Sequence, residues 1–159
     1  MKSMKTSHAF ENIIVLFEGL KTKAYKDSKG IATIGIGTIR YPNGKKVAMG
    51  DVCTEAQAYE YLHHHLSKML GTINGLLVNV DVNQHQFDAI ASLVYNIGVG
   101  GFSASQTLKE IKKDPNNFGS IKTEWLGWCK ETKNGVKEVS KGLLNRRKKE
   151  WQLYTTPID

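Results

Sequence analysis

Residues 18–38 read EGLKTKAYKDSKGIATIGIGT, and this stretch decides the organisation of the chain. It is rich in Gly, Thr and Ile, and Ser28-Lys29-Gly30 is a turn signal between two β-prone runs. A second turn signal, Pro42-Asn43-Gly44, follows. Together they predict a small antiparallel sheet over residues 23–48.

A helix is predicted just before this stretch, from about His8 to Leu20. Its apolar residues recur at the i, i+3, i+4 and i+7 positions of one helix face, and Ser7 is in place to cap the N-terminus. Glu18 falls in the last turn. The negative end of the helix dipole and the neighbouring apolar face both favour the protonated form of a carboxyl group there.

Downstream of the sheet, the pattern is helical. Two capping boxes, Thr54 to Gln57 and Asn83 to Gln86, begin amphipathic segments that reach Ile73 and Gly98. We expect a flexible turn at residues 98–103 and further helices at about 104–113, 116–129 and 141–154. The sequence thus predicts an α+β, mainly α fold: a helix, a small sheet and then only helices.

The length and charge of the chain set further bounds. Its 159 residues suit a single domain, and its net charge is +7. Residues 130–149 hold eight bases and two acids, a net +6 of that total. Such a run is either a solvated face or a surface for polyanions such as wall polymers, lipid head groups or nucleic acid. No nucleic-acid-binding signature accompanies it, so nucleic acid is the weaker choice.

Two other residue groups have simple interpretations. Cys53 and Cys129 have no metal-ligand spacing and are expected to be buried free thiols. The triple His63-His64-His65 is expected to be solvated or partly packed rather than to bind a metal, because chelation on a helix favours i and i+4 positions. No signal peptide and no run of 18 apolar residues is found, so we expect synthesis in a cytoplasm and no stable membrane insertion.

Glu18 and Asp27 are the candidate catalytic pair. Cleavage of a glycosidic bond requires one carboxylic acid to protonate the leaving oxygen and a second carboxylate to stabilise the transition state or activate water. Glu18 ends an apolar helix and Asp27 lies in a polar turn, two different environments of the kind that separate an acid from a base. Thr33 offers a hydroxyl on the following strand. An acid near a helix end and an Asp in a turn are also common for purely structural reasons, so spacing alone does not establish a catalytic pair.

Three blocks of the chain resemble the bacteriophage lysozymes, the endolysins of glycoside hydrolase family 24. They are residues 18–38, residues 92–108 (SLVYNIGVGGFSASQTL) and residues 142–154 (GLLNRRKKEWQLY). The resemblance implies that Glu18, Asp27 and Thr33 form the catalytic set. It also implies a two-lobed lysozyme-like fold within one domain, residues 1–159. A small β lobe (about 21–50) and a helical lobe (about 54–155, with the helix 8–20) would flank a substrate cleft.

The same resemblance implies roles for residues outside the catalytic set. Ile39, Tyr95 and Ser105 would line the substrate cleft, although ordinary packing or turn chemistry would explain each of them equally well. Thr38 is a departure, because many members carry a structural His there. This difference leaves the catalytic residues intact.

Arg147 is a candidate supporting residue. It shares one face of the last helix with Leu143, Trp151 and Tyr154, so it is expected to point partly inward. A cation on an apolar stripe needs a partner, and Glu18 is the partner we expect. The alternative is that Arg147 reaches back to solvent along its own aliphatic stem.

The resemblance implies hydrolysis of the β-1,4 bond between N-acetylmuramic acid and N-acetylglucosamine in bacterial peptidoglycan, with no metal or cofactor. The protein would be a monomer in the host bacterial cytoplasm, released to the wall by a separate holin. The charge of its basic C-terminal region separately predicts contact with the anionic envelope. Two alternatives stay open. One is a lytic transglycosylase acting on the same bond, and the other is a non-catalytic basic protein that binds walls or nucleic acid.

Overall fold

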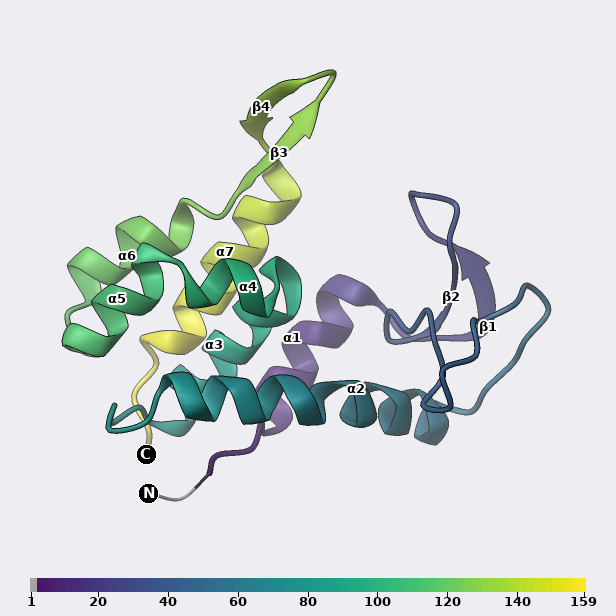
Figure 1. The fold of residues 1–159 in the computed structure, drawn as a ribbon, viewed down its shortest axis with the longest axis horizontal. Coiled ribbons are helices and arrows are strands. Elements are labelled where there is room, and N and C mark those ends of the chain that lie inside the picture. Colours follow the sequence, from purple (N-terminus) through teal and green to yellow (C-terminus); the bar gives the residue numbers. More distant parts are fainter. Residues whose placement is uncertain (1–2) are drawn as a thin grey trace. The chain divides into compact units, whose positions relative to one another are not determined.

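The computed structural model describes residues 3–159, and within them it contains seven helices and two small antiparallel sheets (Figure 1). This confirms the predicted α+β, mainly α class. In chain order the elements are α1 (His8–Glu18), β1 (Lys21–Lys26), β2 (Ala32–Gly35), α2 (Glu55–Leu76), α3 (Gln84–Ile97), α4 (Val99–Ser103), α5 (Gln106–Lys113), α6 (Phe118–Leu126), β3 (Lys130–Lys133), β4 (Val136–Val139) and α7 (Lys141–Tyr154).

The chain divides into two compact units. The small unit comprises Ile14–Met69, and the large unit comprises the chain up to Ile13 together with Leu70–Asp159. The division passes through α1 and α2, so the first part of α2 belongs with the sheet rather than with the later helices. That all residues form a single domain stays a prediction.

The small unit is built on the β1–β2 hairpin. The two strands pair antiparallel with Tyr25 opposite Thr33, and the register shifts between Lys21 and Tyr25. Gly35 ends β2 in a left-handed conformation, and a Cβ there would lie only 3.2 Å from the Ala58 Cβ of α2. Glycine is therefore needed both for the backbone angle and for the close approach of β2 to α2.

The large unit is organised around α3, which packs against α7. Asn83 and Gln86 form the expected capping box at the start of α3, and the Gly98 N–H bonds the Val94 carbonyl at its end. The ring of Trp125 on α6 packs against the rings of Trp151 and Tyr154 on α7. Burial of these apolar faces, rather than helix propensity, supplies most of the stability of such elements.

Two parts of the sequence prediction were wrong. Residues 99–103 form the short helix α4 instead of a flexible turn, because Phe102 is fully buried and anchors the segment. Residues 130–139 form the β3–β4 hairpin, so the chain after the first sheet is not only helical. Its turn consists of Asn134 and Gly135, both with positive φ (51° and 78°), which is the geometry of tight β-hairpins.

The remaining sequence expectations concern thiols, histidines and membrane spans. Cys53 and Cys129 are buried and free, as predicted. The side chains of His63, His64 and His65 are exposed on α2. Within residues 3–159, no cluster of three metal-ligating side chains occurs, and none of the helices has the length and apolar character that a membrane span requires.

Candidate active site

Glu18 is the last residue of α1 and is partly exposed. Gly19 follows with φ +77°, and its N–H bonds the Val15 carbonyl at 2.9 Å, which closes the helix. A left-handed glycine at this position turns the chain out of the helix within one residue. The candidate acid is therefore fixed at the junction between α1 and β1.

Asp27 is held rigidly in the turn between β1 and β2. Its Oδ1 accepts hydrogen bonds from the backbone N–H groups of Lys29 (2.8 Å) and Ile31 (2.9 Å). Its backbone N–H donates to the Ile31 carbonyl, and its carbonyl accepts from the Gly30 N–H, both at 2.9 Å. Among residues 3–159 no group donates to Oδ2. One carboxylate oxygen thus orients the side chain, and the other is available to a water molecule or substrate.

Thr33 is tied to the same backbone residue as Asp27. Its side chain is almost completely buried, and its Oγ1 donates to the Ile31 carbonyl at 2.9 Å. Because the hydroxyl proton is used in that bond, the oxygen keeps its lone pairs as acceptors. The Ile31 backbone therefore joins Asp27 and Thr33 in one hydrogen-bonded unit.

Tyr25 lies near both candidate carboxylates and was missed by the sequence analysis. It pairs directly opposite Thr33, so the two side chains share a face of the hairpin. Burial raises the pKa of Tyr25, and the negative charges of Glu18 and Asp27 raise it further. Both carboxylates are thus within electrostatic range of one phenol. The position of Tyr25 only two residues before Asp27 was the signal that could have shown it.

Ile39 is 44% exposed and borders a hollow of about 310 Å³ in the small unit. Ile31 also lines this hollow, and its backbone binds Asp27 and Thr33. The hollow therefore adjoins the candidate catalytic residues, and Arg40 and Lys46 add positive charge to its largely apolar wall. This placement is compatible with the substrate-contacting role expected of Ile39.

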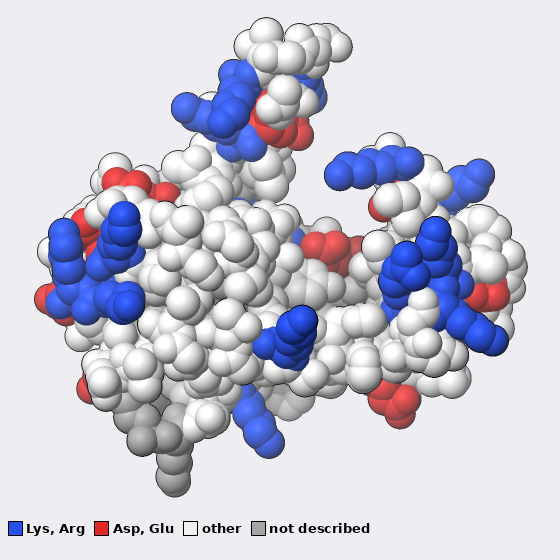
Figure 2. Space-filling view, in the orientation of Figure 1, with Lys and Arg blue, Asp and Glu red and all other residues white. Residues whose placement is uncertain are grey.

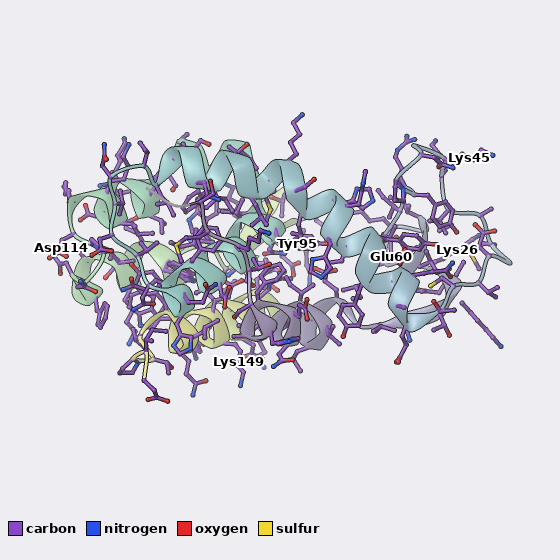
Figure 3. The ribbon with its side chains drawn as sticks, turned by 90° about the horizontal axis from the view of Figure 1, so that it is seen from below. Lys26, Lys45, Glu60, Tyr95, Asp114 and Lys149 are labelled. Carbon is purple, nitrogen blue, oxygen red and sulfur yellow. The ribbon has the colours of Figure 1, made fainter. Side chains whose placement is uncertain are left out.

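The other predicted site residues belong to the large unit. Tyr95 projects from α3 and is half-buried (Figure 3). Ser105 is buried and caps α5: its Oγ accepts from the Leu108 N–H at 3.0 Å and donates to the Phe102 carbonyl at 2.7 Å. Ser105 therefore has the structural capping role that was the alternative to substrate contact. Substrate contact by Tyr95 and Ser105 stays a prediction.

Arg147 is completely buried within α7 and does not reach solvent along its stem. Its Nε lies 2.8 Å from Oε1 of Glu150, its Nη2 donates to Oε2 of Glu150 at 3.1 Å, and its Nη1 donates to the Trp128 carbonyl at 3.2 Å. Nε itself makes no well-aligned hydrogen bond. Burial lowers the pKa of Arg147, and the neighbouring Glu150 opposes that effect.

Glu150 is the counter-ion of Arg147 in the structure. The sequence analysis had expected Glu18 in this role. Glu150 is fully buried and also accepts from the Arg146 Nε (3.3 Å), the Ser92 hydroxyl (2.6 Å) and the Trp125 indole (3.3 Å). The sequence analysis did not identify Arg146 or Glu150, although their i, i+4 spacing was visible. A contact of Arg147 with Glu18 stays a prediction.

The β3–β4 hairpin carries three of the eight bases of residues 130–149, together with both of the acids (Figure 2). Lys133 forms ion pairs with both Glu131 (3.4 Å) and Glu138 (3.7 Å). Alternation along the paired strands places these residues on one face and Lys130, Thr132 and Lys137 on the other. Within residues 3–159, Lys130 and Lys137 have no ion-pair partner, so this second face is positively charged.

Residues 15–150 match the phage lysozyme family. The chain belongs to this family. It is 33% identical over 150 residues to an endolysin of Acyrthosiphon pisum secondary endosymbiont phage 1, covering 92% of this chain and 97% of that protein. It is 36% identical over 137 residues to an endolysin of Salmonella phage P22, covering 86% of this chain and 88% of the other.

The fold agrees with that assignment. The structure of an endolysin from Escherichia coli O157:H7 phage FAHEc1 superposes with a TM-score of 0.89 at 38% identity, covering 97% of this chain and 95% of that one. The three blocks that carried the resemblance in the sequence all lie within, or overlap, the matched range, and Glu18, Asp27 and Thr33 lie inside it.

Proposed function

We propose that this phage lysozyme family member is a peptidoglycan hydrolase that cleaves the β-1,4 bond between N-acetylmuramic acid and N-acetylglucosamine during host lysis. The observation that carries the proposal is the shared attachment of Asp27 and Thr33 to the Ile31 backbone. This arrangement leaves Asp27 Oδ2 and the lone pairs of Thr33 Oγ1 as acceptors, and Tyr25 lies within electrostatic range of both Asp27 and Glu18. It provides what water-mediated cleavage of a glycoside requires.

The chemistry divides among these three residues. Glu18 donates a proton to the glycosidic oxygen as the bond breaks and the anomeric carbon gains positive charge. Asp27 Oδ2 accepts a hydrogen bond from the attacking water, and Thr33 Oγ1 accepts a second one, which orients the water. Because backbone groups fix both acceptors in advance, little reorganisation is needed during the reaction.

Hydrolysis is favoured over lytic transglycosylation by the same geometry. A transglycosylase closes an anhydro ring without water and has no need of a second carboxylate and hydroxyl held together. The comparisons favour neither this alternative nor a non-catalytic binding protein. Ile39, Tyr95 and Ser105 are proposed to contact the glycan, and Arg147 to support the site from within α7.

We further propose a monomer that is made in the host cytoplasm and reaches the wall after a separate holin opens the membrane. Peptidoglycan is the partner, and nucleic acid is not. The unpaired positive face of the β3–β4 hairpin suits contact with the anionic envelope, since exposed lysines without acidic partners attract polyanions.

Mass spectrometry of the products tests this function. Purified walls digested with the protein are expected to yield muropeptides with a reducing-end N-acetylmuramic acid. Products lighter by one water, with an anhydro end, would show transglycosylation instead. An absence of any released muropeptide would support the non-catalytic alternative.

A further inference from the structure

A second hollow in the small unit has the chemistry of a saccharide-binding site. It has a volume of about 510 Å³ and opens widely to solvent. Its lining consists of Tyr41, Pro42, Asn43, Asp51, Val52 and Tyr61. None of these residues borders the hollow formed by Ile31 and Ile39, so the two depressions are separate features of one unit.

The hollow is organised before any ligand binds. The Tyr41 hydroxyl donates to Asp51 Oδ2 at 2.6 Å, and the Ala48 N–H donates to the same oxygen at 3.0 Å. The rings of Tyr41 and Tyr61 pack edge to face with their centroids 5.3 Å apart. These contacts fix two aromatic rings and one carboxylate relative to one another.

Three polar groups of the hollow keep unused hydrogen-bonding capacity. Within residues 3–159, no group donates to Asp51 Oδ1, and the Tyr61 hydroxyl and the Asn43 amide nitrogen have no partner. The Asn43 oxygen already accepts from the Lys45 N–H at 2.9 Å, which orients the amide. The hollow therefore offers an acceptor, a donor and a hydroxyl that can act as either.

This set of groups discriminates among ligand classes. The bond from Tyr41 lowers the pKa of Asp51, so the hollow carries a negative charge that disfavours anions. A lone carboxylate is too few ligands for a divalent cation. A neutral sugar suits all the groups, because its hydroxyls both donate and accept while its C–H face packs on an aromatic ring.

We propose that this hollow is a second glycan-binding site that holds the wall polymer while the candidate catalytic residues act elsewhere on the small unit. The choice of wall glycan as ligand rests on the proposed function, whereas saccharide binding itself rests only on the hollow. An anchoring site of this kind increases the local concentration of a polymeric substrate and contributes nothing for short, soluble fragments.

Val52 provides a variant that tests the proposal without breaking a side-chain bond. Its side chain is 70% exposed at the hollow, and its contact with Lys23 is a backbone bridge that any residue can keep. Val52→Arg should fill the hollow. Val78→Arg is the matched control, because Val78 is 58% exposed, lies in the large unit and gains the same charge.

The first measurement is titration of ¹⁵N-labelled protein with the tetramer of N-acetylglucosamine, in a Glu18→Gln background that prevents turnover. We expect amide shifts at Asn43, Asp51, Val52 and Tyr61, which Val52→Arg abolishes and Val78→Arg retains. Absence of these shifts in the background protein, or their survival in Val52→Arg, would overturn the proposal. The titration measures binding alone, so it decides the question even if the proposed hydrolase activity is wrong.

The second measurement compares two substrates. On insoluble walls Val52→Arg should lower the rate by about tenfold, equivalent to the loss of about 1.4 kcal/mol of binding. On short soluble glycan fragments kcat/KM should equal that of the parent protein. Equal losses on both substrates would place Val52 in the catalytic site instead, and no loss on walls would remove the anchoring role.

Discussion

The Arg147 Nε lies 2.8 Å from Oε1 of Glu150, and both side chains are completely buried. Arg146 shares the same carboxylate, with its Nε 3.3 Å from Oε2. A buried ion pair is costly to desolvate, and removing one partner leaves an uncompensated charge in the interior. The last helix is therefore held in the large unit by a charged network as well as by its aromatic face.

The first prediction concerns this network. Glu150→Gln should lower the free energy of unfolding by about 3–5 kcal/mol, because the fully buried Arg147 guanidinium loses the carboxylate that lies 2.8 Å away. Urea unfolding followed by circular dichroism measures the change. Glu124→Gln, on α6 of the same unit and without a described partner, should change it little. A Glu150→Gln protein as stable as its parent would show that the network contributes no net stability.

The Asp27→Asn variant distinguishes a catalytic role of Asp27 from its structural role in the turn. The Asn oxygen can accept the same backbone bonds from Lys29 and Ile31, so the turn and the melting temperature should be preserved. Wall hydrolysis should fall by about 10² or more, because an amide cannot act as a base toward water. If the variant were to hydrolyse walls at more than half the parental rate, Asp27 would have no role in activating water.

Stability should depend on pH through Asp51. The Tyr41 hydroxyl and then the Ala48 N–H lower the pKa of this carboxyl in the folded protein. A lowered folded pKa gives a stabilising contribution that is complete above the ordinary Asp pKa of about 3.9 and is lost as the pH falls below it.

Thermal melts of the parent and of Asp51→Asn measure this contribution. The parent should melt higher at pH 7, and the difference between the two proteins should shrink below about pH 4. Asp81→Asn, for which no such bond exists among the described residues, should give no comparable trend. A difference that grows on acidification would contradict the assignment.

Lysis should also depend on salt through the β3–β4 hairpin. Because exposed charges are screened over about 10 Å at 0.1 M salt, the rate on walls should fall as ionic strength rises toward that value. A Lys130→Gln/Lys137→Gln protein should start lower at low salt and respond less. Lys133→Gln removes a charge from the opposite face, where it is paired with acids, and should change the slope less. If the rate of the parent protein did not depend on salt, the hairpin would have no role in binding the envelope.

Much of this fold could be read from local signals. The periodicity before Glu18, the turn at Ser28-Lys29-Gly30 and the capping boxes at Thr54 and Asn83 each reflect short-range interactions, and each is present in the structure. The β3–β4 hairpin was missed although Asn134-Gly135 is a strong turn signal, because its strands are charged and exposed on both faces and lack hydrophobic alternation.

Other features depend on contacts that a single sequence does not display. Helix α4 exists because Phe102 is buried, and burial is a property of the folded unit. Likewise, Glu150 pairs with Arg147 because residues of α3, α6 and α7 enclose both side chains. The helix position of Arg147 alone did not indicate this partner. In the candidate site, the residue types and the turn at Asp27 were predictable from the sequence. The hydrogen bonds of Asp27 and Thr33 to the Ile31 backbone, and the proximity of Tyr25 to the two carboxylates, depend on the folded structure.

The most direct test of the central claim is the clearing of purified, peptide-free murein by the parent protein and by Glu18→Gln. Glu60→Gln, an exposed carboxyl on α2, serves as the control (Figure 3). We predict that Glu18→Gln folds normally but clears murein at least about 10² more slowly, as expected for loss of a general acid, while Glu60→Gln matches the parent. A folded Glu18→Gln protein that clears murein at the parental rate would contradict the account.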